Sequence, residues 1–545
     1  MAETSTKASE KKSAGEGIKE TIESIVIAFI LAFVFRAFVV EAFVIPTGSM
    51  ATTLLGAHYR LTCPDCGQQF KVGHVGDGDG DRTSVKSVTN ESNRIQCRGC
   101  GFTIPERMKQ QLPVYYGDRI LVLKYIWLLE EPQRWDVVVF KNPNDQDGQY
   151  AENYIKRLVG RPGEQLMIFD GDVYIRQGDD QPWVVQTKPR AVQEAVWRTV
   201  YDNDHLPRST KMKGGFVQPW KPVSGKGWST GGRVFEFDNA DGAGTLGFDS
   251  APQIEDGELG RRWYPLTDRI AYNIGNSGKG RYYYVSDVRL ALFYERHSGS
   301  GPLDLTLSKY DQAFTARIAD GKATLYGRRL AGPVEGGSRD LGQELKSVAV
   351  DVPVGRPVEI ELENFDYRVA LRIDGREVLA TTPKEYAPEL PEEFTEDAIR
   401  AYGQTPPQIR VTAANQRASI SHVRLDRDLY YRLDEYEAEG KPGSIHYRGH
   451  PTNIVRLAKK AAGGQDDEYF VLGDNSEASL DARMWGDRSA VDLVGTENVR
   501  THAGTVPGRF MIGKAFFVYW PAGFRPFSND LPVVIPNFGE MRFIE

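Results

Sequence analysis

Three short segments of the chain carry side chains that could act together as a catalytic group. A serine, Ser49, follows a glycine in IPTGSM, and a lysine, Lys156, lies in the strand-like run YIKRLVGRPG, which is rich in apolar residues. A third segment, GDNSEASLDARMWG at residues 473–486, is a polar loop bounded by strand-like runs. Each segment is weak alone, but a serine and a lysine together offer a nucleophile and a base for acyl transfer.

The chemistry of this pair depends on burial of the lysine. A serine hydroxyl is a poor nucleophile until a neighbouring base takes its proton. A lysine can be that base only when burial lowers its pKa from about 10.4 toward neutral pH. Ile155, Leu158 and Val159 offer such apolar surroundings for Lys156. None of the eight histidines lies in a segment that resembles a Ser-His-Asp triad, so the lysine is the simpler base.

The order of the motifs resembles that of type I signal peptidases, membrane-anchored serine proteases with a Ser-Lys dyad. In that family an apolar helix is followed by (P)xGSM, GDxIxVxK, YIKRxxGxPG and GDNxxxSxDxR, and the second box occurs here as GDRILVLK at 117–124. The ending GKAFFVYWP at 513–521 resembles the closing strand of the family. The resemblance covers about 21–62, 113–175 and 443–545. It implies an endopeptidase that removes signal peptides from secreted preproteins and uses no cofactor in catalysis.

The resemblance also implies roles for individual residues. Ser49 corresponds to the nucleophile and Lys156 to the general base, so an ester intermediate with the signal peptide is expected. The other implied positions are Thr47 beside the oxyanion, Ser479 orienting the lysine, the loop-holding residues Asp474, Asp481 and Arg483, and Met50, Tyr154 and Ile155 at the substrate.

Four residues depart from the family pattern near these positions. Ser476 stands where arginine is common, Ala478 where asparagine is common, and Ala482 where serine is common. Thr52 replaces a frequent proline after the nucleophile. None of these changes removes a dyad residue, but the hydrogen bonds around the last loop are expected to differ from the family's.

Two strand-like segments offer a place for the substrate. Residues 42–47 and 153–156 present edges to which an extended preprotein segment can add as a β-strand. Small pockets beside these edges would select small side chains at the −1 and −3 positions of the signal peptide.

The four cysteines form two CxxC pairs, each followed by glycine. Cys63 and Cys66 precede Cys97 and Cys100 by a loop of about thirty residues, an arrangement that resembles a zinc ribbon. Two such pairs can place four thiolates around a structural Zn²⁺. Disulfides remain the alternative, because the expected extracytoplasmic location favours them.

The loop between the cysteine pairs contains an acidic run, DGDGD at 77–81. It begins like a calcium-binding loop, but Arg82 occupies the glycine position and no glutamate closes the loop. A solvated loop is therefore predicted.

The N-terminal region carries the membrane signal that must place these groups. Residues 22–35 are strongly apolar, and continuation through Arg36 to Val40 reaches the roughly 20 residues that a membrane-spanning helix needs. A cleaved secretory signal is the alternative, but no A-x-A-type boundary follows the apolar run. A single-pass anchor in the cytoplasmic membrane is predicted, with the catalytic domain extracytoplasmic and the lipid bilayer as a partner.

Short alternating runs separated by Gly, Pro, Asn and Asp dominate the rest of the chain, so the predicted fold is mainly β. Its catalytic part is a signal-peptidase β-fold preceded by one transmembrane helix. The predicted domains are a cytoplasmic tail at 1–20, an anchor at 21–40, a discontinuous catalytic domain at 41–62, 106–180 and 443–545, a zinc-ribbon-like insertion at 63–105, and a β-sandwich-like insertion at 181–442.

The second insertion has strands spaced about ten residues apart, as sandwiches do. It loosely resembles concanavalin-like or laminin-G-like jelly rolls; an elaboration of the catalytic sheet is the alternative. A hairpin is predicted at 367–379, with Asp374 and Gly375 at its turn. The tryptophans of this region are either core residues or a surface for an unidentified ligand: Trp220, Trp228 and Trp263.

Length and charge limit the classes of function. A chain of 545 residues exceeds the size of one hydrophobic core, so several modules are expected. A net charge of −7 argues against nucleic acid as the main partner. Two alternatives remain: a self-cleaving repressor-type protease, which is soluble and normally carries a DNA-binding module, and an inactive membrane-anchored binding or scaffold protein that uses the inserted sandwich.

Overall fold

The structure is a computed structural model of the whole chain. It describes residues 14–74, 95–97, 99–100, 102–109, 112–143, 152–208, 218–250, 266–268, 272, 283–330, 341–433, 435–437, 444–460, 466–485, 502, 504–523 and 535–545. The acidic run at 77–81 and Trp263 lie outside the described residues. Strands account for most of the elements, so the prediction of a mainly β fold is confirmed.

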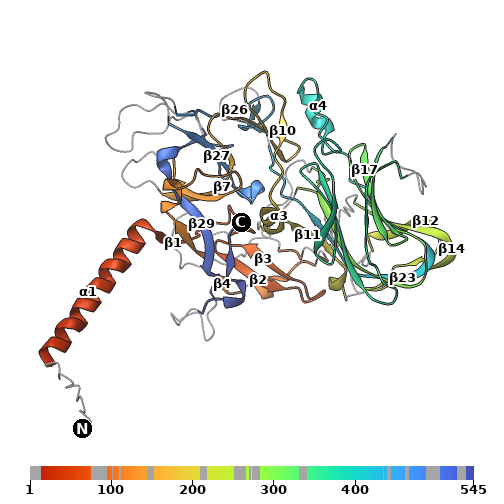
Figure 1. Ribbon diagram of the computed structural model, residues 1–545, viewed down its shortest axis with the longest axis horizontal. Helices are drawn as coiled ribbons and strands as arrows, with labels where there is room; N and C mark the ends of the chain where they lie inside the picture. The colour runs from red at the N-terminus through yellow and green to blue at the C-terminus, as the bar shows by residue number, and fades with distance from the viewer. Residues whose placement is uncertain are drawn as a thin grey trace, which may run out of the picture.

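The N-terminal element is the helix α1, Ala14–Phe38, which projects from the rest of the molecule (Figure 1). It begins before the predicted anchor and ends two residues earlier, because Val40 already belongs to strand β1, Val40–Val44. Many of its large apolar side chains are exposed, among them Ile22, Phe29 and Phe33. Among the described residues, no helix reaches the combination of length and hydropathy that crossing a membrane requires.

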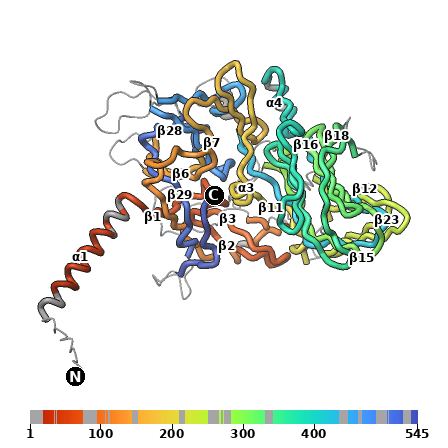
Figure 2. The backbone as a smooth tube through the Cα atoms, in the orientation of Figure 1, coloured from red at the N-terminus to blue at the C-terminus, as the bar shows by residue number. Residues whose placement is uncertain are grey.

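An eight-stranded antiparallel sheet contains the segments that resemble the protease. Its order is β1, β5, β29, β6, β7, β27 and β28, with β30 paired to β29. Strands far apart in the sequence are therefore neighbours, as the colours of Figure 2 show. The bounds are β5 Arg119–Leu123, β6 Val137–Lys141, β7 Asn153–Gly160, β27 Glu468–Leu472, β28 Val506–Pro507, β29 Met511–Trp520 and β30 Arg542–Phe543.

Two small sheets adjoin this one. The order of the first is β10, β9, β8 and β26, and that of the second, which carries the first cysteine pair between its strands, is β3, β2 and β4. Val184 of β10 pairs with Ile175 of β9, so the start of the predicted 181–442 insertion belongs to the catalytic side. The bounds are β8 Gln165–Phe169, β9 Asp172–Arg176, β10 Val184–Val185, β26 Val455–Arg456, β2 His58–Thr62, β3 Gln69–Gly73 and β4 Val114–Tyr115.

A thirteen-stranded sheet occupies the middle of the chain and forms facing layers (Figure 1). Two long strands, β14 (Phe235–Phe248) and β23 (Ile409–Arg427), run through both layers: β23 pairs with β16 at one end and with β15 at the other. The remaining strands are β11 Arg198–Asp202, β12 Trp220–Gly225, β13 Trp228–Ser229, β15 Val288–Gly299, β16 Leu303–Lys309, β17 Gln312–Ala319, β18 Lys322–Arg329, β19 Gln343–Ala349, β20 Val358–Phe365, β21 Arg368–Ile373 and β22 Arg376–Ala380.

The interior of this middle region is a large apolar core between the layers. Trp220 is fully buried in it and Trp228 packs at its margin, so neither is a fully exposed ligand surface. The hairpin predicted at 367–379 is confirmed as β21 and β22. Asp374 and Gly375 both have positive φ, as a two-residue hairpin turn requires.

Short elements complete the described chain. A small two-stranded sheet crosses the predicted border at residue 442. The bounds are α2 Glu106–Lys109, α3 Arg190–Val196, α4 Glu396–Ala401, β24 Glu435–Glu437 and β25 Ser444–His446, with the 3₁₀ turns Tyr125–Leu128, Asn203–His205, Ser476–Ala478, Gly508–Phe510 and Phe538–Glu540.

Candidate active site

Ser49 lies on a tight turn that follows the edge strand β1. The turn is fixed by two backbone hydrogen bonds, from the N–H of Ala51 to the carbonyl of Gly48 at 3.0 Å and from the N–H of Leu54 to the carbonyl of Met50 at 2.9 Å. Met50 has no exposed surface and packs in the apolar core, while Ser49 is half-buried. Burial of Met50 therefore orients the turn and leaves the serine at its surface.

Lys156 comes from β7 and meets this serine although their strands are far apart in the sheet. Four strand spacings separate β1 from β7, which would be about 19 Å in a flat sheet. Instead, Lys156 Nζ lies 2.7 Å from Ser49 Oγ. The sheet curls until its edge strand approaches β7, and this curvature brings together the two residues that the sequence predicts to act as a pair.

The surroundings of Lys156 favour its neutral form. Its side chain is 4% exposed, and burial lowers its pKa from 10.5 to about 8, against smaller upward effects of Asp481 and Asp474. Within the described chain its Nζ also donates to the carbonyl of Ile155 at 3.2 Å and lies 5.5 Å from the ring centre of Tyr154. No carboxylate takes part in these short contacts, so the amine remains available to the serine.

Asp474 is kept from Lys156 by an arginine that sequence reasoning missed. Arg157 donates from Nε and Nη2 to the two carboxylate oxygens of Asp474, both at 2.8 Å, and neither side chain has exposed surface. The hydroxyl of Thr53 donates to the same carboxylate at 2.5 Å. The sequence signal for Arg157 is its place as the arginine of the YIKRxxGxPG motif.

The carboxylate of Asp481 also accepts two hydrogen bonds from an arginine. Arg483 donates from Nε and Nη2 to its two carboxylate oxygens at 2.8 Å, and the N–H of Gly473 donates to it at 2.9 Å. The same guanidinium reaches Ser476 Oγ at 2.9 Å, so the serine found where arginine is common has a structural partner. Asp481 and Arg483 lie together in the loop, as predicted.

Asn475 connects this loop to the nucleophile turn and was also missed. Its side-chain amide donates to the carbonyl of Gly48 at 2.9 Å, and its backbone N–H donates to the carbonyl of Ser49 at 3.0 Å. A Cβ at Gly473 would lie 2.5 Å from the Ser49 carbonyl oxygen, so a side chain there would force the two segments apart. The GDN motif thus holds the backbone on both sides of the serine.

The other predicted positions differ in how they are placed. Ser479 is buried near Ser49, but its Oγ makes no hydrogen bond among the described residues, and its predicted contact with Lys156 is not formed. Thr47 is exposed on the serine turn. Met50 is a core residue with no exposed surface, so its predicted substrate contact is not available in this conformation.

Asp118 of the second box ties distant segments to the site. Its carboxylate accepts from the N–H groups of Leu55 and Ala522 and from Arg542, each at 3.1 Å. The preceding Gly117 has no room for a side chain, because a Cβ there would overlap the Ile45 carbonyl oxygen. The box therefore positions the start of the serine turn.

Two strand edges beside the dyad are unpaired in the described part of the chain. Strand β1 pairs only with β5. Residues 153–156 pair with β6 on one side, while β27 reaches β7 only from Arg157 onward. These are the two edges that the sequence predicts for strand addition.

The sequence profile of the family described as "Signal peptidase, peptidase S26" matches residues 18–77, 104–212 and 406–520, just over half of the chain. The chain belongs to this family. S26 peptidases are serine peptidases, so membership of the family supports a protease. The longest unmatched segment, 213–405, lies inside the predicted 181–442 insertion.

Curated S26 relatives align with only part of the chain. The Signal peptidase I of Rickettsia typhi is 27% identical over 158 residues, which cover 29% of this chain and 43% of the relative. The Signal peptidase I of Rickettsia massiliae is 26% identical over 165 residues, which cover 30% and 46%. The chain thus spans less than half the length of the curated relatives it matches.

Solved structures resemble the chain only weakly. They include the carbohydrate binding module CBM66 from Bacillus subtilis, at 12% identity and a TM-score of 0.23, which covers 38% of this chain and 94% of that chain. The galectin LEC-6 of Caenorhabditis elegans, at 12% identity and a TM-score of 0.17, covers 25% and 84%. Similarity of this degree identifies no ligand for the insertion.

The four cysteines of this S26 member meet in one buried cluster. Sγ of Cys63 lies 3.6 Å from Sγ of Cys100, Cys66 and Cys97 are separated by the same distance, and all four atoms lie within 4.8 Å of one another. A disulfide needs about 2.05 Å, so all four thiols are free in this structure. Four thiolates about 2.3 Å from one Zn²⁺ would be about 3.8 Å apart, so the cysteines fit a tetrahedral ion.

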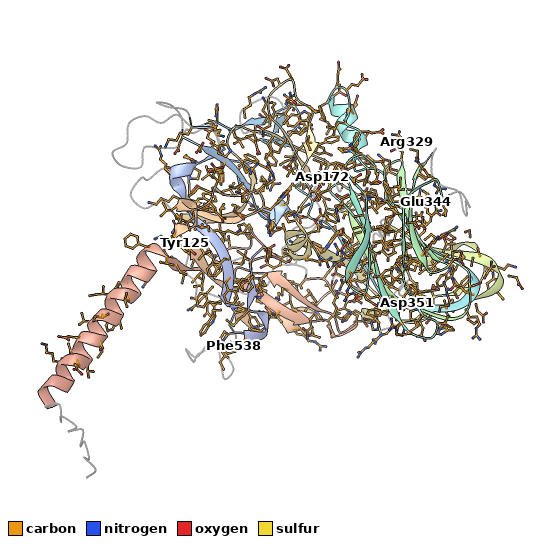
Figure 3. All side chains as sticks on the ribbon, in the orientation of Figure 1. Tyr125, Asp172, Arg329, Glu344, Asp351 and Phe538 are labelled. Carbon is orange, nitrogen blue, oxygen red and sulfur yellow. The ribbon has the colours of Figure 1, made fainter. Side chains whose placement is uncertain are left out.

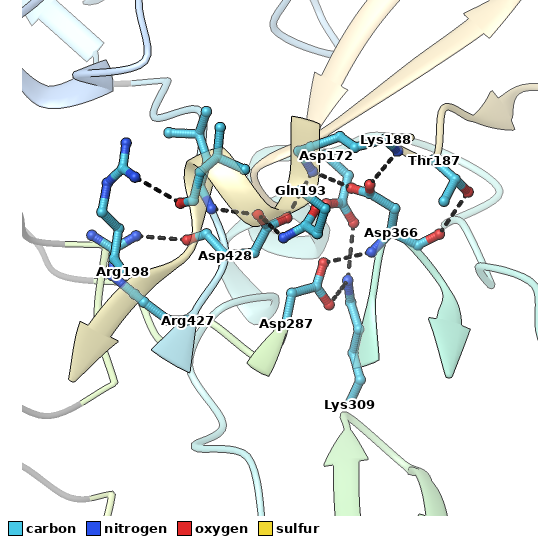
Figure 4. Close-up of polar contacts among 12 residues, drawn as sticks. Asp172, Thr187, Lys188, Gln193, Arg198, Asp287, Lys309, Asp366, Arg427 and Asp428 are labelled. Atoms are coloured by element: carbon cyan, nitrogen blue, oxygen red, sulfur yellow. Dashed lines mark hydrogen bonds and ion pairs between the residues drawn. The ribbon is translucent and has the colours of Figure 1, made fainter. Parts of the chain in front are cut away.

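A second group of ligand-type residues is already neutralised (Figure 4). Oxygens of Asp172, Asp287 and Asp366 lie within 4.8 Å of one another and are buried. Lys309 Nζ sits 2.9 Å from Asp172 and 2.7 Å from Asp287, and Lys188 Nζ sits 2.6 Å from Asp366. Two ammonium groups occupy the place that a cation would take, so this cluster is an ion-pair network.

Proposed function

We propose that this protein is a type I signal peptidase, which removes N-terminal signal peptides from secreted preproteins with Ser49 as nucleophile and Lys156 as general base. The observation that carries the proposal is the 2.7 Å separation of Ser49 Oγ and the buried Lys156 Nζ. Membership of the S26 family supports the reaction class. Among the described residues, the arginines that hold Asp474 and Asp481 leave Lys156 without a carboxylate partner.

The proposed reaction follows from the groups in reach of each other. The neutral amine of Lys156 accepts the hydroxyl proton as Ser49 Oγ bonds to the scissile carbonyl carbon. The C–N bond then breaks, the lysine returns its proton to the leaving amine, and an ester with the signal peptide remains. Water hydrolyses that ester with Lys156 again as base. The Ser49 N–H and the Thr47 hydroxyl would stabilise the oxyanion.

The preprotein would lie as an extended strand between the two open edges. Strand β1 and residues 153–156 both end at the dyad, so a segment paired with them presents its backbone to Ser49. Tyr154 and Ile155 would border the small −1 and −3 pockets. Main-chain hydrogen bonds would supply affinity and the pockets specificity.

Cleavage of a preprotein by matched variants tests this function. Ser49→Ala and Lys156→Ala should each lower kcat by at least about 10³-fold, with product N-termini checked by mass spectrometry. Lys141→Ala, which removes an exposed lysine from the neighbouring strand β6, is the control and should cleave normally. Normal processing by either dyad variant would overturn the proposal.

Helix α1 is proposed to anchor the protein in the cytoplasmic membrane, with the catalytic sheet on the extracytoplasmic side. Its exposed apolar side chains support this, because so large an apolar surface is unfavourable in water. Val26→Lys with Ile30→Lys, two exposed positions one turn apart, should release the protein from membranes in fractionation. Val223→Lys, at an exposed valine elsewhere, should not; release by both would contradict the anchor.

The four cysteines are proposed to hold one structural Zn²⁺, in accord with their separations and burial. Metal analysis of the purified protein should give one zinc per chain. Cys97→Ser should lower that content and the melting temperature, because binding energy at such a site contributes to folding. Two disulfides and no zinc, from a thiol count beside the metal analysis, would refute the site.

A further inference from the structure

One side chain of the insertion reaches the turn that carries the nucleophile. Tyr272 is 1% exposed and packs with Ala51 and Leu55, on the segment after Ser49. A Cβ built on Gly48 would lie 2.8 Å from its Cε1, and one built on Gly73 would lie 2.7 Å from the same atom. The ring is therefore wedged between the nucleophile turn and the end of β3.

The backbone of Tyr272 is fixed at the same place. Its carbonyl accepts the N–H of Gly73 at 2.7 Å. Neither Gly48 nor Gly73 has a positive φ, so backbone conformation does not require glycine at these positions. Glycine is required at both positions because a larger side chain would collide with the tyrosine ring.

The insertion that supplies Tyr272 is firmly joined to the catalytic side. Lys309 of the insertion bridges Asp172 of β9 and Asp287 of the insertion itself. Lys188, which follows β10, pairs with Asp366 at 2.6 Å and with Asp428 at 2.7 Å, both from the insertion. In Figure 3, Asp172 is labelled where the insertion meets the catalytic side. Removing one partner of such a pair would leave an uncompensated buried charge at this junction.

We propose that Tyr272 is a positioning residue through which the 181–442 insertion holds the Ser49 turn in its reactive geometry. The inference rests on the proposed function and extends it, because it gives part of the insertion a role in the reaction. Reactive geometry is sensitive to small displacements, and a shift of about 1 Å can cost about 100-fold in rate. The ring acts by packing and touches no reacting atom.

The test compares Tyr272→Ala and Tyr272→Phe in the full-length protein. Steady-state cleavage of a preprotein gives kcat and KM, with Ser49→Ala as the background. Tyr386→Leu is the matched control, because Tyr386 is a buried tyrosine of the insertion that packs on Phe314 and Tyr367, in its core. Hydrogen exchange of peptides spanning 49–55 reports on the turn without any need for activity.

The expected result is a fall in kcat of about 10-fold to 100-fold in Tyr272→Ala with little change in KM, and near-normal kcat in Tyr272→Phe. Exchange at the amides of Ala51 and Leu54 should accelerate in Tyr272→Ala but not in Tyr386→Leu.

Three outcomes would overturn the inference: unchanged kcat and exchange in Tyr272→Ala, higher kcat in Tyr272→Ala, or equal losses in Tyr272→Phe and Tyr272→Ala. Unchanged kcat with wild-type cleavage intact refutes the positioning role alone. Absence of cleavage by the wild-type protein refutes the proposed function, and the exchange data still decide whether Tyr272 holds the turn.

Discussion

Two buried lysines, Lys156 in the catalytic sheet and Lys309 at the junction with the insertion, have pKa values shifted in opposite directions. Burial lowers the pKa of both. For Lys156 burial prevails and the pKa falls to about 8. For Lys309 the adjacent carboxylates of Asp172 and Asp287 outweigh burial, and the pKa rises well above 10.5. Direct carboxylate contact, more than depth, decides whether a buried lysine is a base or a fixed cation.

In the catalytic sheet, the pKa of Lys156 can fall because the nearby carboxylates are hydrogen-bonded to arginines instead of to the lysine. Asp474 and Asp481 are close enough to raise the pKa of Lys156, but each is held by two hydrogen bonds from an arginine, Arg157 or Arg483. At the junction no arginine competes for Asp172 or Asp287 in the contacts described, and Lys309 takes both. The comparison predicts opposite responses to the same substitution.

Lys156→Met should have the largest effect and act on activity alone. Loss of the base should reduce kcat by at least about 10³-fold. The melting temperature should stay equal or rise. The pKa of Lys156 is about 8 in the folded protein and 10.5 in the unfolded chain, so the lysine favours the unfolded chain at every pH below about 10.5. Preprotein cleavage and calorimetry check the two halves of this prediction. A drop in melting temperature would mean that Lys156 is a structural cation like Lys309.

Lys309→Met should act on stability. It leaves Asp172 and Asp287 buried without their cation, which typically costs about 3–5 kcal/mol in the free energy of unfolding. Chemical denaturation measures the loss, and Lys322→Met, at an exposed lysine of the insertion, is the control that should change little. Equal stability of the two variants would show that the network does not fasten the insertion.

Thr53→Val should have a smaller effect, confined to the catalytic side. The substitution removes the hydroxyl that donates to Asp474 but leaves both bonds from Arg157. A hydrogen bond to a charged group is typically worth about 2 kcal/mol, so the free energy of unfolding should fall by about that amount in denaturation experiments. A loss as large as that of Lys309→Met would mean that Arg157 alone does not hold Asp474.

Arg483→Gln should make Lys156 resemble Lys309. Without the guanidinium, the negative charge of Asp481 acts on the lysine unopposed, so the pKa of Lys156 should rise. The rate at pH 7 should fall, and the pH–rate profile should move to higher pH. Arg376→Gln, at an exposed hairpin turn, is the control. An unshifted profile would argue against shielding by the arginine.

The order of the motifs was sufficient to predict the dyad, because boxes spread over the chain converge in one sheet. Arg483 was predicted together with Asp481 from the same loop motif, but the pairing of Arg157 with Asp474 was not predicted. Arg157 and Asp474 are 317 positions apart, and no periodicity relates them. The family resemblance assigned Met50 to the substrate, but the turn directs its side chain into the core.

For the insertion, the sequence predicted the β character but not the long-range contacts. Alternating strands and the Asp374-Gly375 turn predicted its β character, because those signals are local. The contact of Tyr272 with Gly48 has no local signal, since it joins segments more than 200 residues apart. The helix α1 also starts earlier than its apolar run, because the residues before it include good helix formers such as Glu16 and Lys19.

The central claim, that Lys156 is a general base with a lowered pKa, is tested most directly by the pH dependence of kcat/KM for the wild-type protein. The lysine accepts a proton only when it is deprotonated, so the rate should rise as pH increases through about 8 and then level off. In Arg483→Gln the same rise should occur at higher pH. A rise centred near 10.5, or a rate independent of pH between 7 and 10, would contradict the account.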